Sequence, residues 1–290
     1  MNKAKLIWLT AFSLFCIGLC LKLNADQKES AKDSDGASPI KVLLITGGGW
    51  HDYETQKAIL KETIESRLNA TVDIKWTSTE EHPVESKDTV IPHIFTQDFS
   101  KGYDVVFHNH CHVGFQDDGA IDKAIENHIT NQVGVVMTHG SFHTFKQTPE
   151  QAWDRLCGCN SIKHVQKSPL DVKIIDKNHP VAKALAIDGW KTTEGELYTT
   201  SLNENTKNIA EGTTLKGKTK TDSCIFSHNL QGCNIMGITL GHHNSTMEQE
   251  EFKKLIAYSV LWAAKKLDEG GVPAEGYAIK QTNKKPVKKS

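Results

Sequence analysis

The sequence predicts an α/β protein with a mostly parallel, doubly wound sheet, helices on both faces and a strand-rich second half. Between residues 40 and 157, short β-branched runs alternate with stretches of helical apolar spacing, the pattern of strands joined by crossover helices. Histidines directly follow four of the apolar runs: His51; His108, His110 and His112; His139 and His143; His242 and His243. Parallel strands end at one edge of a sheet, where α/β proteins bind ligands. We therefore expect these histidines to converge on one crevice.

The order of elements follows from the apolar spacing. Strands are expected at residues 40–46, 71–77, 103–108 and 133–138, with helices at 54–68 and 118–130 and a short helix at 149–157. Pro92 interrupts 89–95, which therefore predicts a loop or a short helix. The second half predicts strands at 170–175, 195–199, 208–211, 223–227 and 234–240, and a closing amphipathic helix at 248–267.

One folded domain is expected, at residues 40–269 of the 290-residue chain. Residues 1–25 combine a basic start, an apolar stretch shorter than a membrane span and a small residue before Asp26, as in a cleavable secretory signal. Residues 26–39 predict a disordered linker, and residues 270–290 a basic, flexible tail. The protein is thus expected to be exported, to the periplasm or the extracellular space, with no stable membrane span after cleavage.

Charge and cysteine content narrow the partners and the covalent chemistry. The formal net charge is −1, which gives no overall attraction to nucleic acid, so no nucleic-acid partner is expected. Cys224 and Cys233 flank an expected turn at 229–232 and could form a disulfide across it, because export permits disulfides. Cys157 and Cys159 are too close for an easy bridge, and the odd number of cysteines outside the signal leaves at least one free thiol.

A glycine-rich turn, residues 47–49, follows the first strand. Such a turn can present backbone N–H groups to an anion, but it lacks the dinucleotide fingerprint and the Lys-Ser/Thr of a phosphate loop. A tight turn that needs positive φ explains the glycines equally well. Gly48, Gly49 and Trp50 are expected substrate contacts, and His51 is an expected acid, base or ligand.

His108, His110 and His112 alternate along an extended segment and share one face if the extension continues. Three imidazoles on one face indicate a metal or a substrate, and we expect His110 and His112 to contact the substrate. Cys111 is expected to face the opposite side, without the Gly-x-Cys-x-Gly elbow of a nucleophile.

Residues 138–143 occupy the place where an α/β-hydrolase-like elbow carries its nucleophile. His139 and His143 are four residues apart and share a face if a helix begins there. That spacing can hold a divalent metal ion between two imidazoles, although the motif has no Asp or Glu as a third ligand. We expect both to act in acid–base catalysis, with metal binding or simple hydrogen bonding to nearby loops as alternatives. No other cofactor is expected.

Further polar side chains are placed near strand ends in the second half. Glu196 is the carboxylate best suited to acid–base work or to orienting a histidine, with a solvated strand end as the alternative. Tyr198, His242 and His243 are expected substrate contacts. Three other histidines are expected to lie in loops or in the packing: His164, His179 and His228.

In their order and spacing, these landmarks resemble the ThuA-like (trehalose-utilisation) family, which has a class I glutamine-amidotransferase-like, flavodoxin-type fold. The resemblance spans residues 40–267 and rests on the following residues: the glycine-rich turn with His51, His139-Gly140 with His143, 153–158, His164, His179-Pro180, 196–198, Gly241-His242 and 261–263. It implies a carbohydrate-catabolism protein, linked with trehalose, related disaccharides or their keto-sugar derivatives, that lacks the amidotransferase cysteine. The chain departs from the family at Gly195, where an acidic residue is common, and in its dense histidine cluster at 108–112.

The expected function is an exported sugar-active enzyme, a hydrolase, lyase or isomerase rather than an active glutamine amidotransferase. His139 or His143 would transfer the proton, assisted by Glu196 and His51, and the partner would be a small carbohydrate. The first alternative is a non-catalytic carbohydrate-binding protein in which Trp50 and other aromatic side chains stack on sugar rings. The second is a metal-binding protein that serves transport or storage. The sequence leaves the substrate, the reaction and the oligomeric state open.

Overall fold

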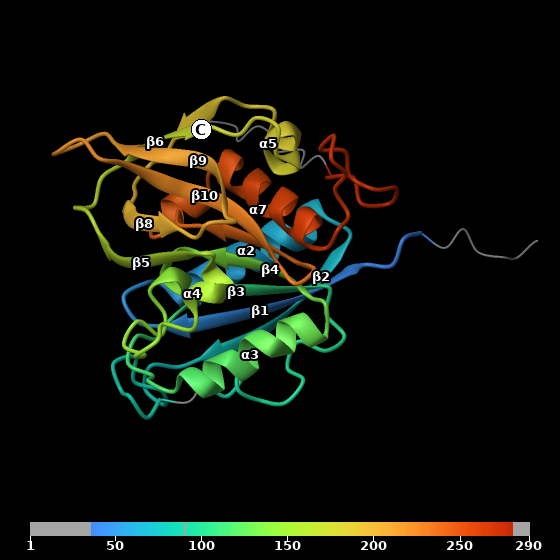
Figure 1. Cartoon of the computed structure of the whole chain (residues 1–290). Coiled ribbons are helices and arrows are strands. Elements are labelled where there is room, and N and C mark those ends of the chain that lie inside the picture. The colour runs from blue at the N-terminus through green and yellow to red at the C-terminus, as the bar shows by residue number, and fades with distance from the viewer. Residues whose placement is uncertain (1–35, 90, 281–290) are drawn as a thin grey trace, which may run out of the picture. The chain divides into compact units, whose positions relative to one another are not determined.

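The computed structural model describes residues 36–89 and 91–280, and the fold lies in the unit Pro39–Ser290. Its main sheet has nine strands in the order β2-β1-β3-β4-β11-β10-β9-β6-β7 (Figure 1). The strands are β1 (Ile40–Gly48), β2 (Ala70–Thr77), β3 (Val105–Cys111), β4 (Gly134–Thr138), β6 (Leu170–Ile174), β7 (Gly189–Lys191), β9 (Lys207–Thr214), β10 (Thr221–Leu230) and β11 (Cys233–Ile238). A separate antiparallel pair joins β5 (Cys159–His164) to β8 (Tyr198–Leu202).

The sheet is parallel in its first half and antiparallel in its second. Strands β2, β1, β3, β4 and β11 pair in parallel, whereas β10, β9, β6 and β7 each pair antiparallel with the strand before them in the sheet. The predicted fold class is confirmed, including the strand-rich second half. The chain runs from β1 outward to β2 and then returns past β1 to β3, which creates a switch point where α/β sheets bind ligands.

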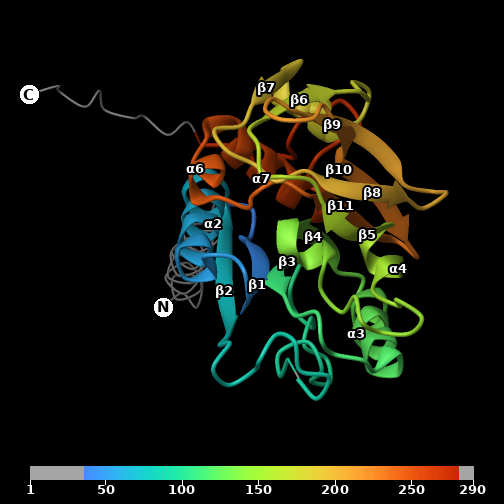
Figure 2. The same cartoon turned by 90° about the vertical axis from the view of Figure 1, so that its left-hand side faces the viewer.

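Helices cover both faces of the parallel half. Helices α2 (Tyr53–Arg67) and α7 (Glu250–Ala263) share one face, and α3 (Asp118–Thr130) covers the other (Figures 1 and 2). Strands β3 and β4 are buried along their whole length, as expected for parallel strands covered on both faces. Shorter elements complete the fold: α4 (Asp154–Cys157), α5 (Pro180–Leu185), α6 (Asn244–Met247) and the 3₁₀ turn η2 (His139–Phe142).

Local sequence explains the helix beginnings next to the sheet edge. The Asp52 carboxylate accepts the Thr55 N–H at the start of α2, and the Asp117 carboxylate accepts the Ala120 N–H at the start of α3. Both are N-caps that satisfy backbone donors without an intrahelical partner. The caps fix where the loops after β1 and β3 end, and therefore how much chain is free to line the edge.

Several expected boundaries differ from the structure. The helix expected at 149–157 is reduced to α4, because Phe145 and Gln151 have positive φ and the chain turns before Asp154. The disulfide between Cys224 and Cys233 that their position around the expected turn would allow is not formed. Cys233 lies opposite Leu230, whereas the Cys224 carbonyl accepts the N–H of Thr239 at the other end of the hairpin. The five cysteines within the described residues are all free and buried.

The chain ends were predicted to be a signal, a linker and a tail. Residues 1–25, nearly all of 26–39 and 281–290 lie outside the described residues. Residues 270–280 differ from a flexible tail, because Tyr277 is buried and the Lys280 N–H donates to the Arg67 carbonyl at 2.8 Å. Among the residues described here, no helix is long and apolar enough to cross a membrane.

Candidate functional site

Four neighbouring parallel strands deliver side chains to one edge of the sheet. His51 follows β1, Cys111 ends β3, His139 follows β4 and His242 follows β11. Glu196 reaches the same place from the loop between β7 and β8. The structure therefore brings together side chains from both the parallel and the antiparallel halves of the sheet.

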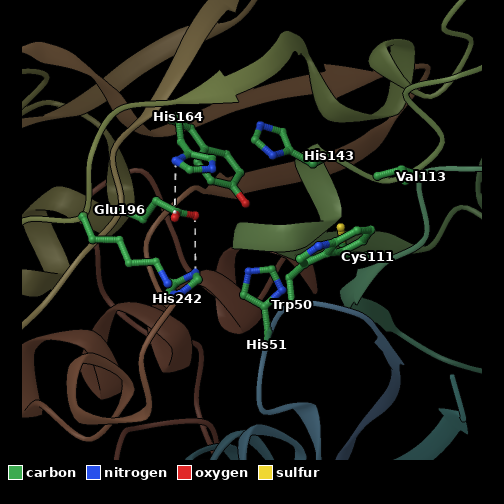
Figure 3. A pocket seen from close by; sticks show the side chains of 10 residues that line it. Trp50, His51, Cys111, Val113, His143, His164, Glu196 and His242 are labelled. Atoms are coloured by element: carbon green, nitrogen blue, oxygen red, sulfur yellow. Dashed lines mark ion pairs between the residues drawn. The ribbon is translucent and has the colours of Figure 1, made fainter. Parts of the chain in front are cut away.

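A pocket of 370 Å³ opens at this edge (Figure 3). Its lining residues are Trp50, His51, Cys111, Val113, His143, His164, Lys167, Glu196, Tyr198 and His242. Trp50 is 54% exposed and has a φ of 68°, in the left-handed region that bulky residues avoid. An exposed, strained tryptophan beside buried polar groups is typical of a functional site.

Glu196 is the electrostatic centre of the pocket. One carboxylate oxygen, Oε2, lies 3.3 Å from His139 Nε2 and 3.3 Å from His242 Nδ1. The other, Oε1, lies 3.3 Å from His164 Nδ1, and Figure 3 shows the carboxylate between His164 and His242. Glu196 is only 5% exposed, so its charge would be costly without these partners.

Backbone carbonyls fix the orientation of two rings. The Nδ1 of His139 lies 2.7 Å from the Thr239 carbonyl oxygen, and the Nδ1 of His51 lies 2.9 Å from the Gly49 carbonyl oxygen. A carbonyl only accepts, so each Nδ1 carries the proton and each Nε2 presents a lone pair. The Nε2 of His51 is buried without a hydrogen-bond partner.

The pKa values follow from this burial. Burial opposes ionisation of Glu196, but the contacts with His139 and His242 outweigh it and hold its pKa below the usual range. Burial lowers the pKa of His139 despite the opposing effect of Glu196. Burial, assisted by His139 and His242, lowers the pKa of His51 to about 2. The centre therefore contains an ionised Glu196 carboxylate beside the neutral rings of His139 and His51 near pH 7.

His143 belongs to an aromatic stack rather than to the group around Glu196. Its ring lies 3.8 Å from the Tyr198 ring at an interplanar angle of 3°, and its Nε2 lies 3.1 Å from Ser161 Oγ. Burial lowers its pKa to about 3. The hydroxyl of Tyr198 donates to His139 Nε2 at 3.1 Å, so the two sets of residues are in contact.

The predicted metal pair of His139 and His143 is corrected by this geometry. The turn at 139–142 is a 3₁₀ helix and His139 has a φ of 36°, so the helical spacing that would align the two rings does not occur. Four residues instead place one possible ligand atom each within 4.8 Å of one another: His51, His139, Glu196 and His242.

The other histidine cluster lies inside the protein. His108, His110 and His112 do share a face, but all three are buried, and His108 Nδ1 lies 3.0 Å from His110 Nε2. Cys111 and Val113 face the pocket instead. The structure thus places His110 and His112 away from the pocket, unlike the expected substrate contacts, because the alternation turned them toward the core.

Gly48, Gly49 and His243 also do not line the pocket. A Cβ on Gly48 would lie 2.1 Å from the Cys111 carbonyl oxygen, and the Gly49 N–H donates to that same oxygen. The glycine-rich turn is therefore needed for close approach of two strands. His243 packs its ring against His242, with 4.5 Å between ring centroids.

Four lining residues were not among the expected site residues: Cys111, Val113, His164 and Lys167. His164 was predicted to be a loop or packing histidine, and Lys167 was not singled out. The only sequence feature that indicated a role for His164 was its place among the residues that resemble the ThuA-like family. The chain folds back there into the β5–β8 pair, which carries residues 164–167 to the pocket.

The fold and the site together define an α/β protein whose sheet is parallel in its first half and carries a histidine- and glutamate-lined pocket at its carboxyl edge. A family model described as "ThuA: Trehalose utilisation" matches residues 41–263. The chain belongs to the ThuA family, as the resemblance predicted.

One solved structure supports this fold, and others show a more distant similarity. A ThuA-like protein from Parabacteroides merdae superposes with a TM-score of 0.64 at 22% identity, covering 84% of this chain and 98% of that one. A carbohydrate deacetylase, Agd3, gives a TM-score of 0.49 at 11% identity over 79% of this chain and 33% of that one. A glutamine amidotransferase from Methylobacillus flagellatus gives 0.44 at 9% identity over 72% of each chain. No curated protein matches the sequence.

Proposed function

We propose that this protein is an exported enzyme of carbohydrate catabolism that acts on a disaccharide or a keto-sugar in the pocket around Glu196. Membership in a family described by trehalose utilisation supports the substrate class, and the order of parts in residues 1–25 supports export. The observation that carries the proposal is an ionised, buried carboxylate held among imidazoles in a pocket that also exposes a tryptophan.

The pocket contains the groups that a sugar requires. The exposed face of Trp50 can pack against the apolar face of a pyranose ring, while imidazoles and the carboxylate bind hydroxyl groups. His143 lines the pocket as a neutral ring held in place by Tyr198 and Ser161. A neutral imidazole accepts a proton from a carbon next to a carbonyl, or from an attacking water at a glycosidic bond. Both reactions remain within the proposal.

The cysteine in the pocket does not support amidotransferase chemistry. Cys111 lies at the end of β3, where burial raises its pKa to about 12, so the thiol stays protonated and is a poor nucleophile. The turn after β4 carries His139 and Gly140 where an elbow nucleophile would stand. These features favour sugar chemistry over glutamine hydrolysis.

The test is a substrate screen with purified protein lacking residues 1–25. Trehalose, other disaccharides and their keto derivatives are incubated with the protein, and products are followed by NMR and mass spectrometry. We expect turnover of at least one sugar, with kcat reduced about 100-fold or more in Glu196→Gln and His143→Ala. The matched control is His93→Ala, a histidine that contacts the Trp76 carbonyl away from the pocket. Turnover of no sugar in the panel would contradict the proposal.

A non-catalytic carbohydrate-binding function is the second candidate, favoured by the exposure of Trp50 in the pocket. Tyr198 supports it less, because its ring is buried against His143 and has no free face. Saturable sugar binding without any product, lost on changing Trp50, would establish this function instead of an enzymatic one.

A further inference from the structure

We propose that His51, His139, His242 and Glu196 bind one divalent transition-metal ion beside the pocket. The inference goes beyond the sugar chemistry above, because it concerns a cation rather than a substrate and holds whether or not the proposed substrate is correct. It rests on the spacing of the four ligand atoms, their lone pairs and the way their rings are held.

The spacing of the ligand atoms matches a tetrahedral site. Nitrogen and oxygen ligands about 2.1 Å from a tetrahedral ion lie about 3.4 Å from one another. The three edges among His139 Nε2, His242 Nδ1 and Glu196 Oε2 measure 3.1, 3.3 and 3.3 Å. The ligand atom of His51 completes the group within 4.8 Å of the other three. Three nitrogens and one oxygen at these distances suit Zn²⁺ and similar ions.

Hydrogen bonds alone leave one ligand atom unsatisfied. The Nε2 of His139 and the Oε2 of Glu196 are both acceptors, and only two donors face them, the Tyr198 hydroxyl and His242 Nδ1. These two donors can satisfy that pair, but the Nε2 of His51 is still buried without a partner. A single cation among the four atoms satisfies all of the lone pairs at once.

The rings are held as metal ligands usually are. A ligating histidine typically donates its second N–H to a carbonyl or carboxylate, which fixes both the tautomer and the ring direction. Thr239 supplies that carbonyl for His139, and Gly49 supplies it for His51. The two rings therefore present their Nε2 lone pairs before any ion binds.

The cluster of His108, His110 and His128 lacks the features of a metal site. His108 bonds to His110 through Nδ1 and to His128 through Nε2, and His110 bonds onward to Thr144. The paired nitrogens of this chain face one another two at a time, so protons can alternate along it. The unpartnered nitrogens of His128 and His112 do not join a group that could hold a metal ion. Within residues 36–89 and 91–280, the group around Glu196 is the one that meets the criterion of a metal site.

The bound ion would be open to a ligand from the pocket, because His51, Glu196 and His242 also line it. An oxygen-rich ligand such as a hydroxy-ketone would therefore add a fifth ligand to the four from the protein, and the ion would act as a Lewis acid on its carbonyl oxygen. A carbonyl beside a hydroxyl is the chemical feature that this site would select.

The experiment measures metal binding directly. The tag-free full domain, stripped with chelator and dialysed, is titrated with Zn²⁺ by calorimetry and with Co²⁺ by visible absorption. We expect one equivalent of Zn²⁺ and the intense visible bands of tetrahedral Co²⁺. Affinity should fall by more than about 100-fold in Glu196→Gln and His51→Ala, beyond the effect typical of changing an outer-shell partner.

The matched control is His143→Ala, which removes a histidine from the same pocket but not from the four ligands. It should bind one equivalent with unchanged affinity, and the melting temperature of each metal-free variant confirms folding. His242→Ala serves if either ligand variant fails to fold. No saturable binding by the wild type, or equal binding by the ligand variants, overturns the site. Zinc binding without sugar turnover would support the metal site and refute the proposed enzyme function. Sugar turnover by protein that binds no metal would support the enzyme function and refute the metal site.

Discussion

At the scale of single residues, two strained backbone positions lie where the pocket is built. Trp50 and His139 both have positive φ, at 68° and 36°, although neither is a glycine. Such conformations cost about 1–3 kcal/mol each and persist where the surroundings enforce them. At Trp50 the conformation keeps a large ring exposed beside the pocket, so the cost is linked to ligand contact rather than to packing.

Two substitutions separate the ring of Trp50 from its backbone. Trp50→Ala and Trp50→Gly should both raise the KM for a sugar roughly 10-fold, because each removes the stacking surface. Trp50→Gly should also raise stability by about 1 kcal/mol over Trp50→Ala, since glycine adopts positive φ without strain. Steady-state kinetics and urea unfolding measure the two effects. An unchanged KM in both variants would exclude Trp50 from the binding surface.

The sequence predicted which residues lie at the site better than it predicted which of them contact one another. His51, His139 and His242 follow strands that end at one edge, so strand pattern alone predicted that they meet. Glu196 was predicted to assist the histidines, but which rings it contacts depends on the loop after β7, which no local pattern specifies. The pairing of His139 with His143 failed because it assumed helical dihedrals, and His139 adopts a left-handed one.

At the scale of elements, close packing of α7 on β4 fixes one face of the sheet. A Cβ on Gly134, at the start of β4, would lie 2.2 Å from the carbonyl oxygen of Ala263 at the end of α7. That neighbour is backbone and cannot move aside as a flexible side chain would. Glycine is therefore required for the distance between this helix and the sheet.

Gly134→Ala should lower the free energy of unfolding by about 1–3 kcal/mol, the usual cost of overpacking. Gly119→Ala makes the same substitution on the exposed face of α3, where only the Asp117 carboxylate is near. It should be neutral or stabilising by up to about 1 kcal/mol, because alanine favours the helix. Denaturant unfolding compares the two, and equal stabilities would show that the helix can shift.

Elements of strong periodicity were predictable, and those set by tertiary contact were not. Helix α3 has the bounds expected from its apolar spacing, residues 118–130, because Asp117 caps it. Strands β5 and β7 were not expected. β5 exposes Lys163 and His164 at its end, and β7 has only three residues, so neither carries an alternating pattern. Both form because a neighbouring strand supplies their hydrogen bonds.

At the scale of the whole molecule, buried neutral histidines link stability to pH. Burial lowers the pKa of His128 to about 3, and that of His112 and of His179 to about 4. In the unfolded chain these groups titrate near 6.5, the pKa of an unperturbed histidine. The unfolded state therefore binds more protons below pH 6.5, so stability rises with pH across this window.

Acidification should consequently destabilise the domain before its carboxylates titrate. The stability is full above about pH 6.5, and each such histidine costs about 2–3 kcal/mol by about pH 4.5. Urea unfolding at a series of pH values measures how steeply the free energy of unfolding changes with pH. That slope should decrease in His128→Gln, and His179→Gln tests the same effect if His128→Gln does not fold. A flat profile between pH 7 and pH 4.5 would contradict the neutral, buried state of these rings.

The free, buried cysteines give a second prediction for the whole domain. A native disulfide contributes about 2–4 kcal/mol, and none is formed among the five cysteines that the structure describes. Reducing agent should thus leave the melting temperature unchanged. Thiol titration of denatured protein lacking residues 1–25 should detect all five cysteines, whereas three thiols would indicate a disulfide that the structure does not contain.

The histidines around Glu196 come from separate parts of the chain. His51 and His139 follow β1 and β4, whereas His242 follows the much later strand β11. A ribosome therefore releases His51 and His139 long before His242 follows from the end of β11. Until then the emerging chain has an incomplete site, and neither a sugar nor an ion meets all of its partners. Occupancy thus requires the chain to extend through His242, and a ligand bound there links the loops after β1, β4 and β11 against unfolding and proteolysis.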